Sequence, residues 1–120
     1  MTIYDVRDAL LSVTDRAYHY KAPRTVADSG DSYVVWGETG ITSLPADDGP
    51  AEWALSGLVY YYTPEEYDPL FDDICRALAE AGVAVRPGRI GYDESRSETS
   101  YELVWEIPAA PFALYADPEG

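Results

Sequence analysis

The chain begins with a stretch whose hydrophobic pattern is helical. Thr2 is a candidate N-cap, and Asp5 stands three residues later, where a capping box places an acid. Four apolar residues then recur at helical spacing, namely Ile3, Val6, Leu10 and Val13. The pattern therefore predicts an amphipathic helix over residues 2–13.

Three segments rich in β-forming residues follow this helix. The first is an aromatic run over residues 17–21, and the second covers residues 33–36. Residues 37–50 contain several glycines and prolines, which indicates a long connection or a wide hairpin. The third strand, residues 52–62, has the clearest alternation. One face of it presents Trp53, Leu55, Val59 and Tyr61, and the other presents Glu52, Ala54, Ser56, Leu58 and Tyr60.

A second helix is predicted between Thr63 and Gly82. Thr63 is placed as the N-cap, Pro64 at the first helical position, and Glu66 as the partner in a capping box. Gly82 is a natural C-terminal stop. The apolar stripe of this helix consists of Tyr67, Leu70, Phe71, Ile74, Leu78 and Ala81.

Two further strands complete the pattern. Residues 83–92 form the first, and Pro87 with Gly88 indicates an edge strand or a bulge there. Residues 99–107 form the second, and Pro108 ends it. The order α-β-β-β-α-β-β predicts an α+β fold, with two helices packed on a mostly antiparallel sheet. We expect one domain over residues 1–107, followed by an extended or loosely docked tail over residues 108–120.

The charge balance excludes several classes of function. The chain has 120 residues, with 22 acids against 8 bases and a formal net charge of −14. Nucleic-acid phosphates and anionic membranes both attract basic proteins, so we expect no direct binding to either. The excess of acids then has two interpretations: it provides solubility, or it forms a surface that repels or imitates DNA.

The N-terminal residues have neither a basic region nor an apolar core of the kind found in secretion signals. No apolar stretch approaches the roughly 18 residues that span a bilayer. We therefore expect the chain to remain in the cytosol of the cell that makes it, with no membrane association.

Candidate catalytic residues are few. His19 is the one histidine, and a general base needs a positioned partner, so a structural role is favoured. Cys75 is the one cysteine, and it falls on the apolar side of the second helix. The acid pairs, including Asp47 and Asp48, lack the spacing of a calcium loop. We therefore expect no enzymatic activity, no cofactor and no metal site.

The aromatic residues point instead to a protein partner. The chain has 11 Tyr and 3 Trp but only 2 Phe, and Tyr and Trp are enriched where a partner buries a surface. Two helices are too few to cover both faces of a five-stranded sheet. The candidate interface residues are Trp36, Trp53, Tyr60, Tyr62 and Tyr101.

Several short motifs resemble a family of small proteins encoded in the tail modules of long-tailed, siphovirus-like phages. They are the runs YHYKAP and YVVWGE, the pattern LxGxVxYYT, then EYDP, ALxxAG and YDE, and finally YELVWE. Together they span roughly residues 3–107. The chain is thereby similar to tail-terminator or tail-completion proteins.

This resemblance implies a structural virion protein at the tail–neck junction, made in the bacterial cytoplasm. Such proteins form a homo-oligomeric ring, commonly a hexamer, that caps the tail tube and contacts the tube protein and the neck or connector. DNA passes through the ring without specific binding, and an acidic lumen suits that passage. The loop containing Asp47 and Asp48 is a candidate to line the lumen or reach a neighbouring copy.

Beside a hydrolase that uses clustered carboxylates, which the sequence favours least, two alternatives stay open. One is another ring protein of the phage neck, which has a similar size. The other is an acidic DNA mimic that blocks a host DNA-binding protein. A mimic needs acids spaced like phosphates along one surface, whereas Glu102 and Glu106 are scattered among apolar residues.

Overall fold

The computed structural model describes residues 1–44 and 52–115. The five strands form one sheet in the order β1-β2-β3-β5-β4, in which β1 runs parallel to β2 and the other neighbours are antiparallel. The elements are α1 (Ile3–Val13), β1 (Ala17–His19), α2 (Arg24–Ala27), β2 (Tyr33–Leu44), β3 (Glu52–Thr63), α3 (Leu70–Glu80), β4 (Ala84–Asp93) and β5 (Glu98–Ala109). The predicted α+β class and the mostly antiparallel sheet are therefore confirmed.

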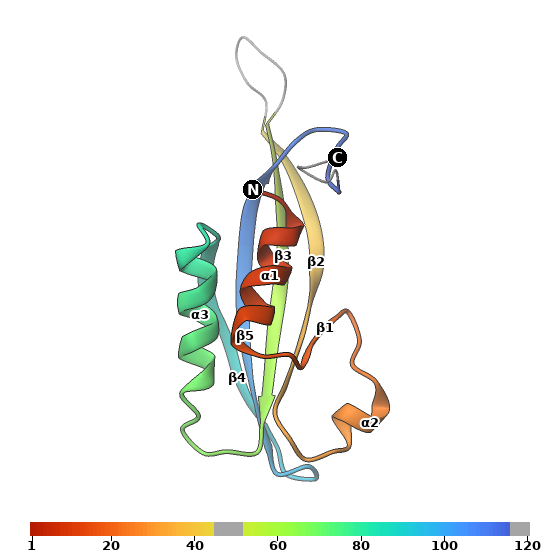
Figure 1. The fold of residues 1–120 in the computed structure, drawn as a ribbon, viewed down its shortest axis with the longest axis vertical. Coiled ribbons are helices and arrows are strands. Elements are labelled where there is room, and N and C mark those ends of the chain that lie inside the picture. The colour runs from red at the N-terminus through yellow and green to blue at the C-terminus, as the bar shows by residue number, and fades with distance from the viewer. Residues whose placement is uncertain (45–51, 116–120) are drawn as a thin grey trace.

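Helices α1 and α3 pack side by side on one face of the sheet (Figure 1). Thr2 caps α1 and forms the predicted capping box with Asp5. The helix then buries Ile3, Val6 and Leu10 against the sheet. The hydrophobic core thus lies between these two helices and one face of the sheet, which we call the helix-covered face.

Strand β3 shows the alternation that its sequence predicts. Leu55, Val59 and Tyr61 are buried, while Leu58 and Tyr60 between them are half-buried. Gly57 also belongs to the buried set, and a side chain there would collide with the indole of Trp105 on β5. Trp105 is fully buried and donates from Nε1 to the Leu58 carbonyl at 3.3 Å. The glycine therefore makes room for the largest side chain of the core.

The strand before this one is longer than its sequence indicates. Residues 37–50 were predicted to form a long connection or a wide hairpin, and the hairpin is found: β2 continues through residues 37–44 and pairs antiparallel with β3. A shift of register between Glu38 and Gly40 absorbs one extra residue. The glycines that indicated a loop instead accommodate a β-bulge and the close approach of Tyr20 over Gly37.

The start of the second long helix was also predicted wrongly. Thr63 is the last residue of β3 rather than an N-cap, and α3 begins at Leu70. Pro69 disfavours helical geometry in the residue before it, and Asp68 accepts a hydrogen bond from the Leu70 amide at 2.9 Å. The helix therefore begins after this proline. Its end is as predicted, with Gly82 at φ +87.

Two smaller corrections concern α2 and the end of β5. The four-residue helix α2 carries no amphipathic pattern, and the sequence did not predict it. Strand β5 passes through Pro108 to Ala109, whereas Pro108 was expected to end it. Strand β4 begins opposite Glu106, so the missing N–H of Pro108 lies beside no strand on that edge. The predicted irregularity at Pro87 is confirmed, because the register of the edge strand β4 shifts there.

Candidate interaction surface

Within residues 1–44 and 52–115, no helix lies across the centre of the sheet face opposite α1 and α3. Strand register places on it one set of residues from four strands. We call this set the open face: Tyr33, Val35, Leu58, Tyr60, Tyr62, Arg86, Glu102 and Val104. Most of these side chains are half-buried within the chain, so apolar surface is left accessible to a partner.

A groove of about 480 Å³ crosses the open face between β2 and β4. Leu58 and Val104 provide its apolar floor, and Arg86 and Glu106 border it. A smaller hollow of about 110 Å³ adjoins this groove at Leu58 and is lined by Tyr20 and Tyr60. The open face is thus concave and amphipathic, as protein-binding surfaces commonly are.

The tyrosines of the open face form a stacked row. The rings of Tyr33 and Tyr62 lie 4.9 Å apart, and those of Tyr60 and Tyr62 lie 6.3 Å apart. Burial raises the pKa of all three phenols above the usual range. They therefore stay neutral at physiological pH and offer both a flat apolar surface and a hydroxyl.

The lower end of this face is closed by the chain itself. Arg96 donates to the Ala27 carbonyl at 2.9 Å and pairs with Asp28 at 3.3 Å, both beside α2. Tyr33 and Glu98 are buried in this region. Burial raises the pKa of Glu98, and Asp93 adds to that effect although Arg96 opposes it.

The five residues predicted as an interface do not form one surface. Tyr60 and Tyr62 lie on the open face, as expected. Trp36 belongs to the core cluster and is only 6% exposed, so it leaves little surface for a partner. Tyr101 is on the helix-covered face and stacks on Phe71 at 4.9 Å. Sequence alternation along one strand does not reveal which face the helices cover, and this explains the mixture.

Two other predicted positions lie elsewhere. Trp53 is half-buried at the start of β3, and its ring lies 5.1 Å from that of Phe112, which is 94% exposed. Asp47 and Asp48, the candidate lumen residues, lie outside the described residues.

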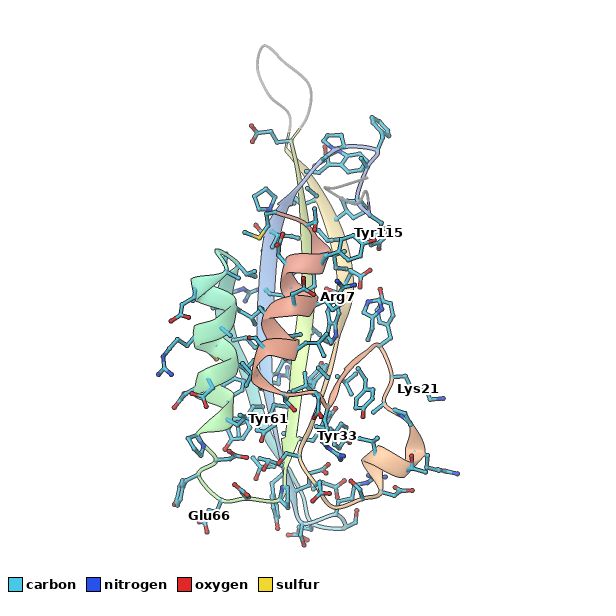
Figure 2. All side chains as sticks on the ribbon, viewed as in Figure 1. Arg7, Lys21, Tyr33, Tyr61, Glu66 and Tyr115 are labelled. Carbon is cyan, nitrogen blue, oxygen red and sulfur yellow. The ribbon has the colours of Figure 1, made fainter. Side chains whose placement is uncertain are left out.

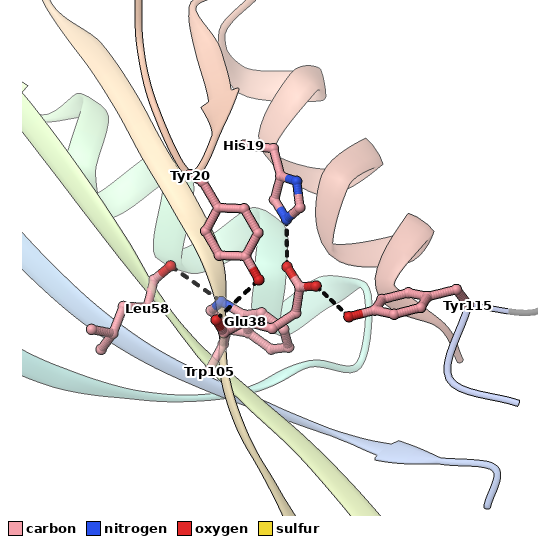
Figure 3. Close-up of polar contacts among 6 residues, drawn as sticks. All are labelled: His19, Tyr20, Glu38, Leu58, Trp105 and Tyr115. Atoms are coloured by element: carbon pink, nitrogen blue, oxygen red, sulfur yellow. Dashed lines mark hydrogen bonds and ion pairs between the residues drawn. The ribbon is translucent and has the colours of Figure 1, made fainter. Parts of the chain in front are cut away.

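A polar cluster around Glu38 was not predicted from the sequence. Glu38 lies on β2, just after the residues that pair with β1. One of its carboxylate oxygens pairs with His19, and the other accepts a hydrogen bond from the Tyr115 hydroxyl at 2.6 Å (Figure 3). Burial works to raise the pKa of Glu38, but hydrogen bonds from Tyr115 and His19 outweigh it and lower the pKa. The same contact raises the pKa of Tyr115 to about 12.

This cluster ties the C-terminal segment to the domain. Tyr4 of α1 donates to the Tyr115 carbonyl at 3.2 Å, so α1 and β2 both contact the segment. His19 also lies against Trp36, with ring centroids 4.6 Å apart. Glu38 is thus the ionic partner of His19. Figure 2 shows Tyr115, the third member of this cluster, in the upper part of the molecule.

A second polar cluster holds the turn before α3. Asp68 accepts from the Tyr61 hydroxyl at 2.6 Å and from the Thr63 hydroxyl at 2.7 Å. Ser32 donates to the Thr63 hydroxyl at 3.0 Å. Burial raises the pKa of Tyr61 to about 12, helped by its bond to Asp68. Burial of Asp68 opposes ionisation, but the bonds it accepts outweigh this and lower its pKa.

The other candidate groups considered in the sequence are the thiol of Cys75 and clusters of possible metal ligands. Cys75 is half-buried against the core, as expected, and burial raises the pKa of its thiol. Within residues 1–44 and 52–115, no three His, Cys, Asp or Glu side chains are grouped so that they could hold a metal ion. In the same part of the chain, no helix is long and apolar enough to cross a membrane.

No protein-family model matches the chain, and no curated protein matches its sequence. Among solved structures, it is similar to the sheath/tube terminator, in the extended state, of an extracellular contractile injection system called PVC. The identity is 13% and the TM-score 0.43, over 92% of this chain and 57% of that one. The chain thus spans a little more than half of that protein's length, and the likeness by itself supports no conclusion about fold or function.

Proposed function

We propose that this chain is a structural protein of a phage tail that assembles into a ring, ends the tail tube and joins it to the neck. The observation that supports assembly is the open face, where a concave apolar groove and a row of tyrosines lie without a helix across them. The sequence motifs that resemble tail-terminator proteins supply the particular role.

A ring requires contacts between two different surfaces of each copy, because the same interface must repeat around an axis. The described residues offer two such surfaces. The open face is apolar and concave, and the outer sides of the helices and turns carry many of the acids, among them Asp72 and Asp73 at the start of α3. This asymmetry suits a heterologous contact between copies.

The net charge of −14 fits the same role. Like charges keep phosphates away from a wall, so an acidic lumen lets DNA pass without binding. In this proposal the ring is a hexamer, holds no cofactor and catalyses no reaction.

Electron microscopy in negative stain tests the proposal. The protein is mixed with phage tail tubes that lack a terminator, and the tube ends are imaged. We expect ring-shaped particles at one end of each tube. Bare tube ends with all of the protein left as single chains would overturn the proposal, and competition with DNA for a host nuclease would favour the DNA mimic instead.

A further inference from the structure

The turn between β3 and α3 displays one aromatic side chain to solvent. Tyr67 is 88% exposed and has φ +56, a left-handed conformation that residues other than glycine rarely adopt. Strained residues of this kind persist only where their surroundings hold them, and they concentrate at functional positions. An exposed phenol in a strained turn therefore calls for an explanation beyond folding.

The surroundings do hold this turn. Asp68 follows Tyr67 directly and is fixed by hydrogen bonds from Tyr61, Thr63 and the Leu70 amide. Pro69 comes next and restricts the backbone further. Tyr67 is thus presented on a rigid support, which lowers the entropy lost when a partner binds it.

Negative charge surrounds the exposed ring. Glu65 and Glu66 precede it and are exposed, and Figure 2 shows Glu66 at the lower end of the molecule. Asp72 and Asp73 follow in the first turn of α3. A surface that receives this turn must therefore offer an apolar hollow bordered by positive charge.

The groove on the open face offers the apolar hollow, and its border carries the positive charge of Arg86 beside the acid Glu106. Its floor is Leu58 and Val104, and Arg86 lines it, with Arg89 three residues further along the same strand. Both arginines are exposed, and neither forms an ion pair within residues 1–44 and 52–115. By contrast, Arg7, Arg76 and Arg96 each pair with an aspartate of this chain.

We propose that Tyr67 of one copy inserts into the open-face groove of the next copy, with Glu65 and Glu66 meeting Arg86 and Arg89. Aromatic anchors in desolvated pockets commonly dominate binding energy, and surrounding charges set orientation. The contact joins a turn at one end of the molecule to a groove on its sheet, so it is heterologous and can repeat around a ring. This inference rests on the proposed assembly and names its contact.

Two variants and their mixture test the contact. Tyr67→Ala removes the anchor and keeps the groove, while Val104→Glu fills the groove floor with charge and keeps the anchor. In the presence of tail tubes, each variant alone is expected to form at least ten-fold fewer rings than the wild type. Mixed together, they retain one working contact and are expected to form only pairs, seen as twice the chain mass by sedimentation velocity.

Tyr92→Ala is the matched control, because Tyr92 is also an exposed tyrosine but lies on β4 beside Thr99, facing away from the groove. It is expected to assemble as the wild type does. If Tyr67→Ala assembles equally well, the proposed contact is overturned while the ring itself stands.

Disulfide trapping tests the contact without requiring a stable ring. In a Cys75→Ala background, Tyr67→Cys is mixed with Val104→Cys and oxidised, and Tyr92→Cys with Val104→Cys serves as the control. We expect several-fold more heterodimer in the first mixture. Equal heterodimer yields in the two mixtures would overturn the contact. If Tyr67→Cys is trapped preferentially but electron microscopy shows bare tube ends, only the tail role is overturned.

Discussion

The two faces of the sheet differ in how far the rest of the chain covers their side chains. On the helix-covered face, α1 and α3 bury Val59, Leu103 and Trp105. The indole N–H of Trp105 donates a hydrogen bond to a backbone carbonyl inside the chain. On the open face, Tyr60, Leu58 and Val104 are half-buried with no helix over them. The difference teaches that one face specifies the fold, while the other is available for assembly.

The largest expected effect on this comparison comes from Trp105→Ala. The substitution removes a fully buried indole and leaves a cavity beside Gly57, so we expect a loss of about 3–5 kcal/mol in the free energy of unfolding. Urea denaturation measures it. Tyr60→Ala on the open face is the control, with an expected loss of at most about 1 kcal/mol. Equal losses at the two positions would contradict the distinction between the faces.

Asp68→Ala comes next. It removes the shared acceptor of Tyr61 and Thr63, so the O–H donors of both residues lose their acceptor, and we expect a loss of about 1–3 kcal/mol in the free energy of unfolding. Asp72→Ala, in the exposed first turn of α3, is the control and should change this free energy by less than about 1 kcal/mol. A loss no larger than the control's would mean that the turn is not held by Asp68.

The pH dependence at this residue has a definite sign. Because the pKa of Asp68 is lowered in the folded state, its contribution to stability is present above the unfolded pKa of about 4. That contribution is lost as the pH falls through the lowered folded pKa. Denaturation curves measured across this acidic range should therefore show a loss in the wild type that is smaller in Asp68→Ala.

Glu98→Gln should have a smaller effect with the opposite sign. Glu98 lies at the closed end of the open face with a raised pKa, so its stabilising contribution is lost as the pH rises through that raised value. The glutamine variant cannot ionise, and we expect it to be more stable than the wild type at pH 7. The advantage should disappear below pH 4, and an advantage independent of pH would contradict the assignment.

The smallest effect is expected for Tyr115→Phe. It removes the hydrogen bond to Glu38 near the protein surface, so the expected loss of stability is about 0.5 kcal/mol. The sharper measurement is proteolysis of the C-terminal segment, which should become faster because one of the two hydrogen bonds that tie Tyr115 to the domain is lost. The Tyr4→Phe variant removes the other of these bonds and should give a similar increase in rate.

Much of the fold follows from local sequence rules. The capping box of α1, the alternation along β3 and the stop at Gly82 are each encoded in a few neighbouring residues. The start of α3 is not encoded in this way, because Asp68 accepts hydrogen bonds from Tyr61 and Thr63 of the preceding strand as well as from the amide of Leu70. Capping rules at Thr63 consider only the next three residues, so they could not include bonds to Asp68, five residues further on.

The candidate surface was only partly predictable for a similar reason. Alternation separates Tyr60 and Tyr62 from Tyr61, and this separation is correct. The position of Trp36 in the core and the pairing of Glu38 with Tyr115 depend on contacts between segments distant in sequence. The exposure of Tyr67 was also not predicted, because its spacing assigned it to a helix stripe, whereas it lies in the turn before α3 with a left-handed backbone conformation.

Particle mass tests the central claim most directly, namely that the open face mediates assembly. Light scattering compares the wild type with Val104→Glu, each in the presence of tail tubes and each shown to be folded by circular dichroism. We predict that the wild type adds to each tail tube a mass that is a multiple of the 13.3 kDa chain, and that the variant adds none and stays at 13.3 kDa. A wild type that remains at the mass of one chain, or a variant that assembles equally well, would contradict the claim.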